Sequence, residues 1–151
     1  NLMLEWGSHH VVLEHHAGSN AAGIWVIIPD QKVIFVGDSV LVAQPPFLAF
    51  ADLADWLEDL KLLTSAKYKN YQIVSGRDGI ISMEDVREMA KQLRSIQRYI
   101  SQVHEKGADT ETLLTIAGKL MKFYEDQPQN QDIFLNRLRW GLTSYCEMHK
   151  E

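Results

Sequence analysis

The chain has 151 residues, enough for one ordinary domain with a sizeable core, and its 46% hydrophobic and 23% charged residues are typical of a globular protein. The formal net charge of −5 argues against binding to a phosphate backbone, so we expect no nucleic-acid partner. The single cysteine, Cys146, excludes an internal disulfide framework. No apolar stretch approaches the roughly 20 residues that span a bilayer, so we expect no membrane partner and a cytoplasmic location.

The first part of the chain is predicted to form strands. Residues 9–16 alternate loosely between apolar and polar side chains, while 24–29 and 32–37 are continuous apolar runs rich in β-branched residues. The "PDQ" segment at 29–31 has turn chemistry, so these two runs are expected to pair as a hairpin. The residues before position 9 show no clear strand pattern, so the sequence does not predict in which element Trp6 lies.

Between the first two of these strands lies "AGSNAAG", at 17–23, which consists of small residues. It is predicted to be a loop in which Gly18 and Gly23 let the backbone pass close to another part of the molecule.

Helices become more frequent after the hairpin. The paired prolines of "QPPF" at 44–47 indicate an extended loop. Apolar residues then recur at three and four positions from 49 to about 65, which predicts an amphipathic helix. A short strand is expected at 71–76, followed by a loop, "SGRDGI".

Three consecutive helices are predicted at the C-terminal end. Ser82 begins "SMED", a capping box, before a helix from 83 to about 105 that Gly107 ends. A second helix is expected from about 109 to 124, with the "DQPQN" segment breaking it, and a third from about 130 to 148.

Some conspicuous side chains are interpreted as structural. Adjacent histidines on a strand point to opposite faces, and no third ligand lies at metal-binding spacing, so the four early histidines are expected on the surface or at a sheet edge. Three tryptophans lie on apolar faces and are expected in a core or an interface, and Cys146 is expected to be a buried or half-buried thiol. The residues are His9, His10, His15 and His16, with Trp25, Trp56 and Trp140.

The order of these elements resembles a known family. "AGSNAAGIWVIIPDQKVIFVGDSV", followed by a helix and then "YQIVSGRDGIIS", is similar to the C-terminal half of the metallo-β-lactamase superfamily over about residues 9–105. The resemblance implies an α/β fold, part of an αβ/βα sandwich with additional C-terminal helices. It also implies a division into 1–106, half of such a domain, and 107–151, a helical extension packed on it.

The resemblance also implies where metal ligands would lie. The family binds up to two zinc ions through a loop histidine, an aspartate in a G-D pair and a later histidine, with a further cluster, H-x-H-x-D-H, in its N-terminal half. Asp38 matches the aspartate, whereas Asn20 and Arg77 stand at the two histidine positions. The loop glycines of these motifs are Gly18, Gly23, Gly37 and Gly76. An amide is a poor zinc ligand and a guanidinium has no lone pair, so Arg77 is expected to pair with Asp38 instead.

Two functions are compatible with this resemblance. The first is a protein related to metal-dependent hydrolases, with impaired or absent hydrolysis and with zinc bound weakly or not at all. The second is a non-catalytic binding or dimerisation module derived from that fold. Arg77 and Asp78 are read either as an anion-binding pair or as an ordinary exposed turn. The small-molecule ligand is unknown, and we expect a homo-oligomer or pairing with an N-terminal half outside these residues.

Overall fold

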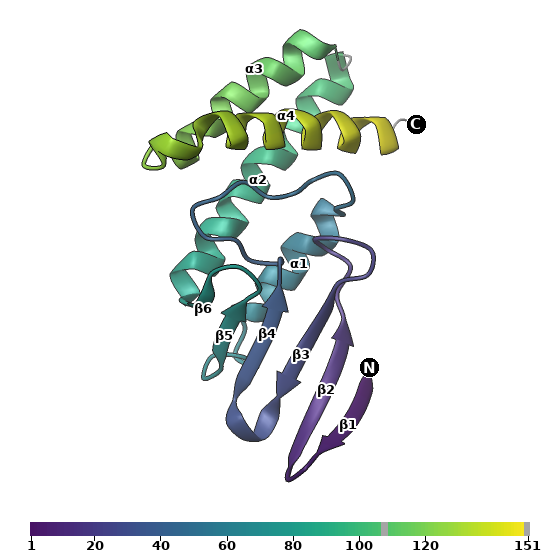
Figure 1. The fold of residues 1–151 in the computed structure, drawn as a ribbon. Coiled ribbons are helices and arrows are strands. Elements are labelled where there is room, and N and C mark those ends of the chain that lie inside the picture. The colour runs from purple at the N-terminus through teal and green to yellow at the C-terminus, as the bar shows by residue number, and fades with distance from the viewer. Residues whose placement is uncertain (107–108, 150–151) are drawn as a thin grey trace. The chain divides into compact units, whose positions relative to one another are not determined.

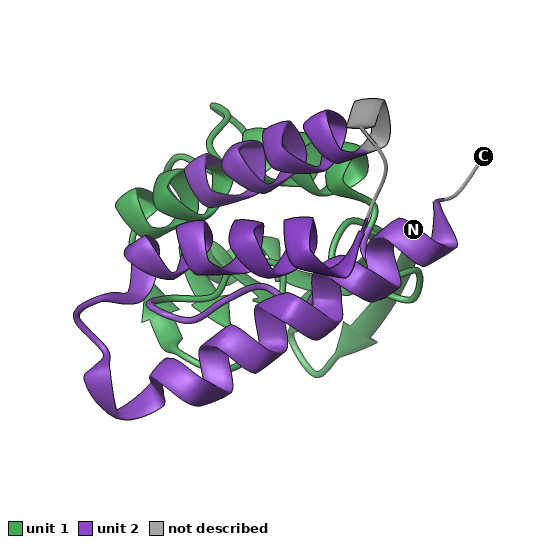
Figure 2. Cartoon of the chain, turned by 90° about the horizontal axis from the view of Figure 1, so that it is seen from above, with its two compact units in different colours: residues 1–42, 52–90 green, residues 43–51, 91–151 purple. Residues whose placement is uncertain are grey.

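The computed structural model describes residues 1–106 and 109–149, and its ribbon is drawn in Figure 1. The chain divides into two compact units, Asn1–Val42 with Asp52–Ala90 and Ala43–Ala51 with Lys91–Glu151 (Figure 2). The predicted helix end at Gly107 lies outside the described residues. The domain boundary expected after residue 106 stays a prediction.

The first unit is built on one six-stranded mixed sheet. Its strands are β1 (Leu2–Trp6), β2 (His9–His15), β3 (Ile24–Ile28), β4 (Val33–Gly37), β5 (Gln72–Ser75) and β6 (Gly79–Ile81). They lie in sequence order across the sheet, and every neighbouring pair is antiparallel except β4 and β5, which are parallel. The expected hairpin of β3 and β4 is confirmed. The α/β class expected from the sequence is confirmed as well.

The outermost strands, β1 and β6, are absent from the sequence prediction. A glycine in the left-handed region precedes or begins the second strand of each hairpin, Gly7 with φ 62° and Gly79 with φ 71°. The run "LMLEW" does not alternate between polar and apolar residues, and β6 has only three residues. Neither strand therefore carries the period-2 pattern by which a strand is recognised.

Helix α1 (Leu53–Leu63) covers one face of the sheet (Figure 1), together with the first residues of α2 (Met83–Lys106). Helix α1 begins later than expected, because the carboxylate of Asp52 accepts hydrogen bonds from the amides of Ala54 and Asp55, both at 2.9 Å. The core on this face is apolar and buried. It contains Trp25, Ile27, Ile34, Val36, Ile73 and Ile81 of the sheet, with Leu53, Trp56, Leu60, Leu63, Val86 and Met89 of the helices.

The opposite face of the same sheet is also apolar, but it is largely open. Strand register assigns twelve apolar side chains to it, and all except Val11 are exposed or half-buried. They are Leu2, Leu4, Trp6, Val11, Leu13, Ile24, Val26, Ile28, Val33, Phe35, Val74 and Ile80, and are called the open sheet face below. A sheet with two apolar faces is typical of a layer packed on both sides.

The second unit is helical. It contains the remainder of α2, α3 (Thr110–Leu120), a 3-10 segment (Met121–Tyr124) and α4 (Gln131–Met148). The expected series of three helices is confirmed, and Asp109 caps α3 by accepting a hydrogen bond from the amide of Thr112 at 2.6 Å. No helix of the described residues is long and apolar enough to cross a membrane.

A buried loop and a hydrogen bond consolidate this unit. Leu48 of the Pro-Pro loop is fully buried against Gly141 of α4, where an added Cβ would lie 3.2 Å from the Leu48 Cβ. The hydroxyl of Tyr124 donates to the side-chain oxygen of Gln92 at 2.8 Å. Cys146 is buried, as expected, whereas Trp140 is 53% exposed and does not belong to the core.

Candidate functional site

The carboxyl ends of β4 and β5 bring together the two residues on which the sequence prediction depends. Asp38 follows β4 and Arg77 follows β5, and parallel strands end at the same edge of a sheet. The amide of Gly76 donates to the carbonyl oxygen of Gly37 at 2.8 Å. A Cβ on Gly76 would lie 3.2 Å from the Gly37 backbone and 3.3 Å from Oδ1 of Asp38, so a glycine permits this close approach.

Arg77 and Asp38 form the expected ion pair. Nε of Arg77 donates to both carboxylate oxygens at 3.1 Å, and Nη2 donates to Oδ2 at 2.9 Å. These hydrogen bonds raise the pKa of the Arg77 guanidinium above its ordinary value. Because the side chains are 54% and 42% exposed, solvent screens the pair and it contributes little to stability. The ion pair instead changes what the Asp38 carboxylate can bind. Both of its oxygens accept hydrogen bonds from the guanidinium, which has no lone pair with which to ligate a metal.

Two buried tryptophans hold the turn that carries Asp38. The indole N–H of Trp25 donates to Oγ of Ser39 at 2.9 Å, and that of Trp56 donates to the Ser39 carbonyl oxygen at 2.8 Å. Both tryptophans are in the core, as expected, but their role as donors beside Asp38 was not predicted. That role depends on Trp56, a helix residue 17 positions from Ser39, so no local pattern could have indicated it.

The segment after Asp38 is fixed to the β5–β6 turn. The hydroxyl of Ser75 donates to the carbonyl oxygen of Val40 at 2.8 Å, and Oδ2 of Asp78 accepts from the amide of Val42 at 3.0 Å. Asp78 thus connects two loops, and the two interpretations of Arg77 and Asp78, an anion-binding pair or an exposed turn, stay predictions. The backbone of the turn that carries Asp38 is therefore held on both sides by hydrogen bonds to other parts of the first unit.

Asn20 is engaged within its own loop. It is exposed, and its Oδ1 accepts from the amide of Ala22 at 3.0 Å, an Asx turn. The expected close approach of the loop glycines is confirmed, because a Cβ on Gly18 would clash with the Trp56 backbone and one on Gly23 with the carbonyl oxygen of His16. The assignment of Asn20 as a former ligand position stays a prediction.

The prediction of four surface histidines is wrong for His16. Its ring is buried and stacked on Trp25 with the ring centroids 3.6 Å apart, and Nδ1 lies 2.6 Å from Oδ1 of Asp59 on α1. Nε2 lies 3.5 Å from Oε2 of Glu14, which also accepts from the hydroxyl of Tyr68 at 3.4 Å. Because Asp59 lies 43 positions away, no local spacing in the sequence could reveal this partner.

The other three early histidines, His9, His10 and His15, are exposed, as expected. His10 pairs with Asp30, whose pKa is lowered by hydrogen bonds from the His10 backbone and ring. Among the side chains of residues 1–103 and 109–149, no group of three or more His, Cys, Asp or Glu is arranged to hold a metal ion. The donor set around Asp38 therefore does not fit a bound metal, because the neighbouring side chain is a cation.

The mixed sheet, its helices and the strand-end turns together define part of a metallo-β-lactamase fold. No protein-family model matches the sequence, and no curated protein matches it either. Among solved structures, an archaeal metallo-β-lactamase superfamily protein from Sulfolobus tokodaii matches with a TM-score of 0.56 and 17% identity, covering 93% of this chain and 50% of that one.

Two further solved structures are similar. A metallo-β-lactamase family protein from Thermus thermophilus has a TM-score of 0.54 and 19% identity, covering 97% of this chain and 47% of its own. A metallo-β-lactamase from Pontibacter korlensis has a TM-score of 0.54 and 19% identity, covering 62% of this chain and 45% of its own. The chain thus spans about half the length of these proteins, and the likeness at such identities concerns the fold.

Proposed function

We propose that this chain is a half of a metallo-β-lactamase-like fold in which an arginine has taken the place of a metal contact, and that the chain does not itself support metal-dependent hydrolysis. The observation that carries the proposal is the three hydrogen bonds from Arg77 to the Asp38 carboxylate. A metal ion at Asp38 would need oxygen lone pairs that now accept from the guanidinium, and it would lie beside a fixed positive charge. The Asx turn of Asn20 supports the same conclusion, because the loop uses its amide oxygen.

Zinc binding tests this proposal directly. After dialysis against zinc, the wild-type chain and the Asp38→Asn variant are expected to retain the same amount of zinc, because Asp38 holds no ion in the wild type. Arg77→His supplies an imidazole and frees the carboxylate, so zinc affinity at this position is expected to rise by about tenfold or more. Isothermal titration and elemental analysis measure both quantities.

A matched control keeps the zinc experiment specific. Arg87→His also replaces an exposed arginine that pairs with a carboxylate, Glu84 at 3.1 Å, but it lies on α2 away from the strand ends. Arg87→His is expected to bind zinc like the wild type. One equivalent of zinc in the wild-type chain, lost in Asp38→Asn, contradicts the proposal. So does zinc-dependent hydrolysis of a p-nitrophenyl ester that Asp38→Asn abolishes.

The open sheet face supports a second candidate, a module that associates through that face. Its exposed members come from four of the six strands, and Trp6 and Ile80 are 76% and 67% exposed at the two edges. A contiguous apolar surface of this kind marks an interaction site. Two such faces stack well as sheets about 10 Å apart, so the occupant proposed for this chain in solution is a second copy.

Light scattering tests this candidate. The 151-residue chain is expected to form a dimer, and the double substitution Ile24→Lys with Phe35→Lys is expected to raise the dissociation constant at least about 100-fold, because two charges must then be desolvated. Ile133→Lys is the control, since Ile133 is also an exposed apolar residue, at 60% against 54% for Ile24, but lies on α4. A monomeric wild type, or a dimer that Ile133→Lys disrupts instead, refutes this candidate. Circular dichroism confirms that each variant is folded.

A further inference from the structure

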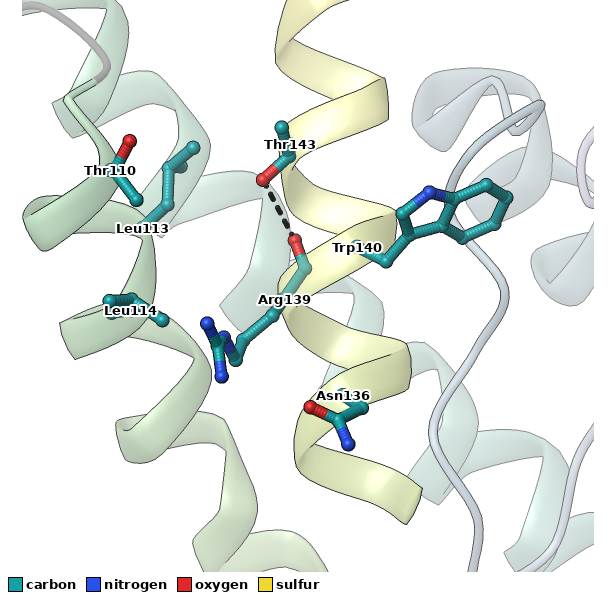
Figure 3. Close-up of a pocket in the computed structure, with 7 residues that line it drawn as sticks. All are labelled: Thr110, Leu113, Leu114, Asn136, Arg139, Trp140 and Thr143. Atoms are coloured by element: carbon teal, nitrogen blue, oxygen red, sulfur yellow. Dashed lines mark hydrogen bonds between the residues drawn. The ribbon is translucent and has the colours of Figure 1, made fainter. Parts of the chain in front are cut away.

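The helical unit contains a cavity that plays no part in the function proposed above. It lies between α3 and α4 and has a volume of about 370 Å³, within the size range of small-molecule sites. Seven residues line it, and Figure 3 shows them on the two helices. They are Thr110, Leu113, Leu114, Asn136, Arg139, Trp140 and Thr143.

The lining combines an apolar wall with one cation. Leu113 is buried and Leu114 is partly exposed on α3, and the side chain of Arg139 extends from α4 toward Leu114 (Figure 3). The indole of Trp140 points to the other side of α4, where its ring lies 5.1 Å from that of Phe47. The hydroxyl of Thr143 donates to the Arg139 carbonyl oxygen at 3.0 Å.

The guanidinium of Arg139 is available to a ligand. Among the side chains of residues 1–103 and 109–149, no carboxylate pairs with it. Arg137, on the same helix, differs, because its Nη1 donates to Oε1 of Gln44 at 3.2 Å and to the carbonyl oxygen of Pro45 at 3.3 Å. Arg137 thus fastens the Pro-Pro loop, whereas Arg139 presents its charge at the edge of an apolar cavity.

We propose that this cavity binds a small monocarboxylate with an apolar body, in which Arg139 pairs with the carboxylate and Leu113 and Leu114 contact the hydrocarbon. A guanidinium binds a carboxylate through two parallel hydrogen bonds, so the exposed Arg139 is the charged partner for an anion at the rim of the cavity. The apolar wall favours a hydrocarbon body over a fully polar anion such as phosphate. A cationic or uncharged amphiphile would contact Leu113 and Leu114 but would form no ion pair with Arg139.

Titration with octanoate, followed by NMR, tests the proposal. Octanoate is expected to shift the methyl resonances of Thr110, Leu113, Leu114 and Thr143 saturably, while octylamine leaves them unchanged. Arg139→Gln is expected to weaken octanoate binding by about tenfold or more, since a charge-assisted bond is lost. Leu114→Gln is expected to weaken it several-fold while leaving the preference for octanoate over octylamine.

The control is Arg98→Gln, which removes the same charge from an exposed position of α2 that does not line the cavity. It is expected to bind octanoate like the wild type. Equal binding by Arg139→Gln and Arg98→Gln overturns the proposal, as do octylamine binding of equal strength, shifts confined to the open sheet face, and the absence of saturable binding. These results bear only on α3 and α4, so they are independent of the zinc experiment at Asp38.

Discussion

Gly18→Ala is expected to destabilise the protein by about 3 kcal/mol or more, because the new methyl group has no room. The added Cβ would lie 2.7 Å from the backbone nitrogen of Trp56 and 2.8 Å from Oδ2 of Asp59. The first atom belongs to helix backbone and cannot move without shifting α1. The loop is also tied down at this point, since the Gly18 carbonyl oxygen accepts from the amide of Asp52 at 3.0 Å. Thermal unfolding is expected to shift downward by roughly 6–12 °C.

Gly118→Ala is the matched control for this substitution. An added Cβ on Gly118, in the interior of α3, would meet no atom within 4 Å. Alanine restricts the unfolded chain and favours helix, so a gain of about 0.5–1 kcal/mol is expected. Equal unfolding temperatures for Gly18→Ala and the wild type would show that α1 does not pack on the loop as described.

Trp56→Ala is expected to cost about 3–5 kcal/mol, the range for removing a large buried aromatic side chain. Trp56 is 1% exposed, and its indole is one of two donors to Ser39. Trp56→Phe keeps most of the ring volume and removes the donor, so about 1–3 kcal/mol is expected from the unsatisfied Ser39 carbonyl group. Denaturant unfolding monitored by circular dichroism measures these values.

Trp6→Ala provides the comparison for Trp56→Ala. Trp6 is 76% exposed on the edge strand β1 of the single chain, so at concentrations low enough to keep the chain monomeric its removal is expected to change the free energy of unfolding by less than about 0.5 kcal/mol. A large loss of stability in Trp6→Ala would mean that the open sheet face is covered in solution, which is the outcome expected if the chain associates through that face.

The sequence predicted most of the fold because its central elements follow local rules. The hairpin of β3 and β4 follows from apolar runs around a "PDQ" turn, and the start of α2 follows from the Ser82 capping box, in which Asp85 accepts from the Ser82 amide at 2.7 Å. The strands that were missed lie at the two edges of the sheet. Their pairing partners, rather than their own patterns, make them strands.

The candidate site was predicted in part for a similar reason. The contact of Arg77 with Asp38 followed from the order of the family's motifs, which places both at the ends of neighbouring strands. The burial of His16 depends on Asp59, and the anchoring of Asp38 depends on Trp56, both of which belong to α1. Interactions between a loop and a helix more than 15 positions away are decided by tertiary packing, which a single sequence does not display.

The two indole donors on Ser39 have a consequence for how this scaffold can be engineered. They hold the backbone of the turn that carries Asp38, whereas residue 77 contacts only the Asp38 carboxylate and is 54% exposed. Position 77 is accordingly expected to tolerate different side chains without a change in the fold. A library varied at residue 77 would place metal ligands, cations and hydrogen-bond donors beside the same acidic side chain, on a turn that other residues hold.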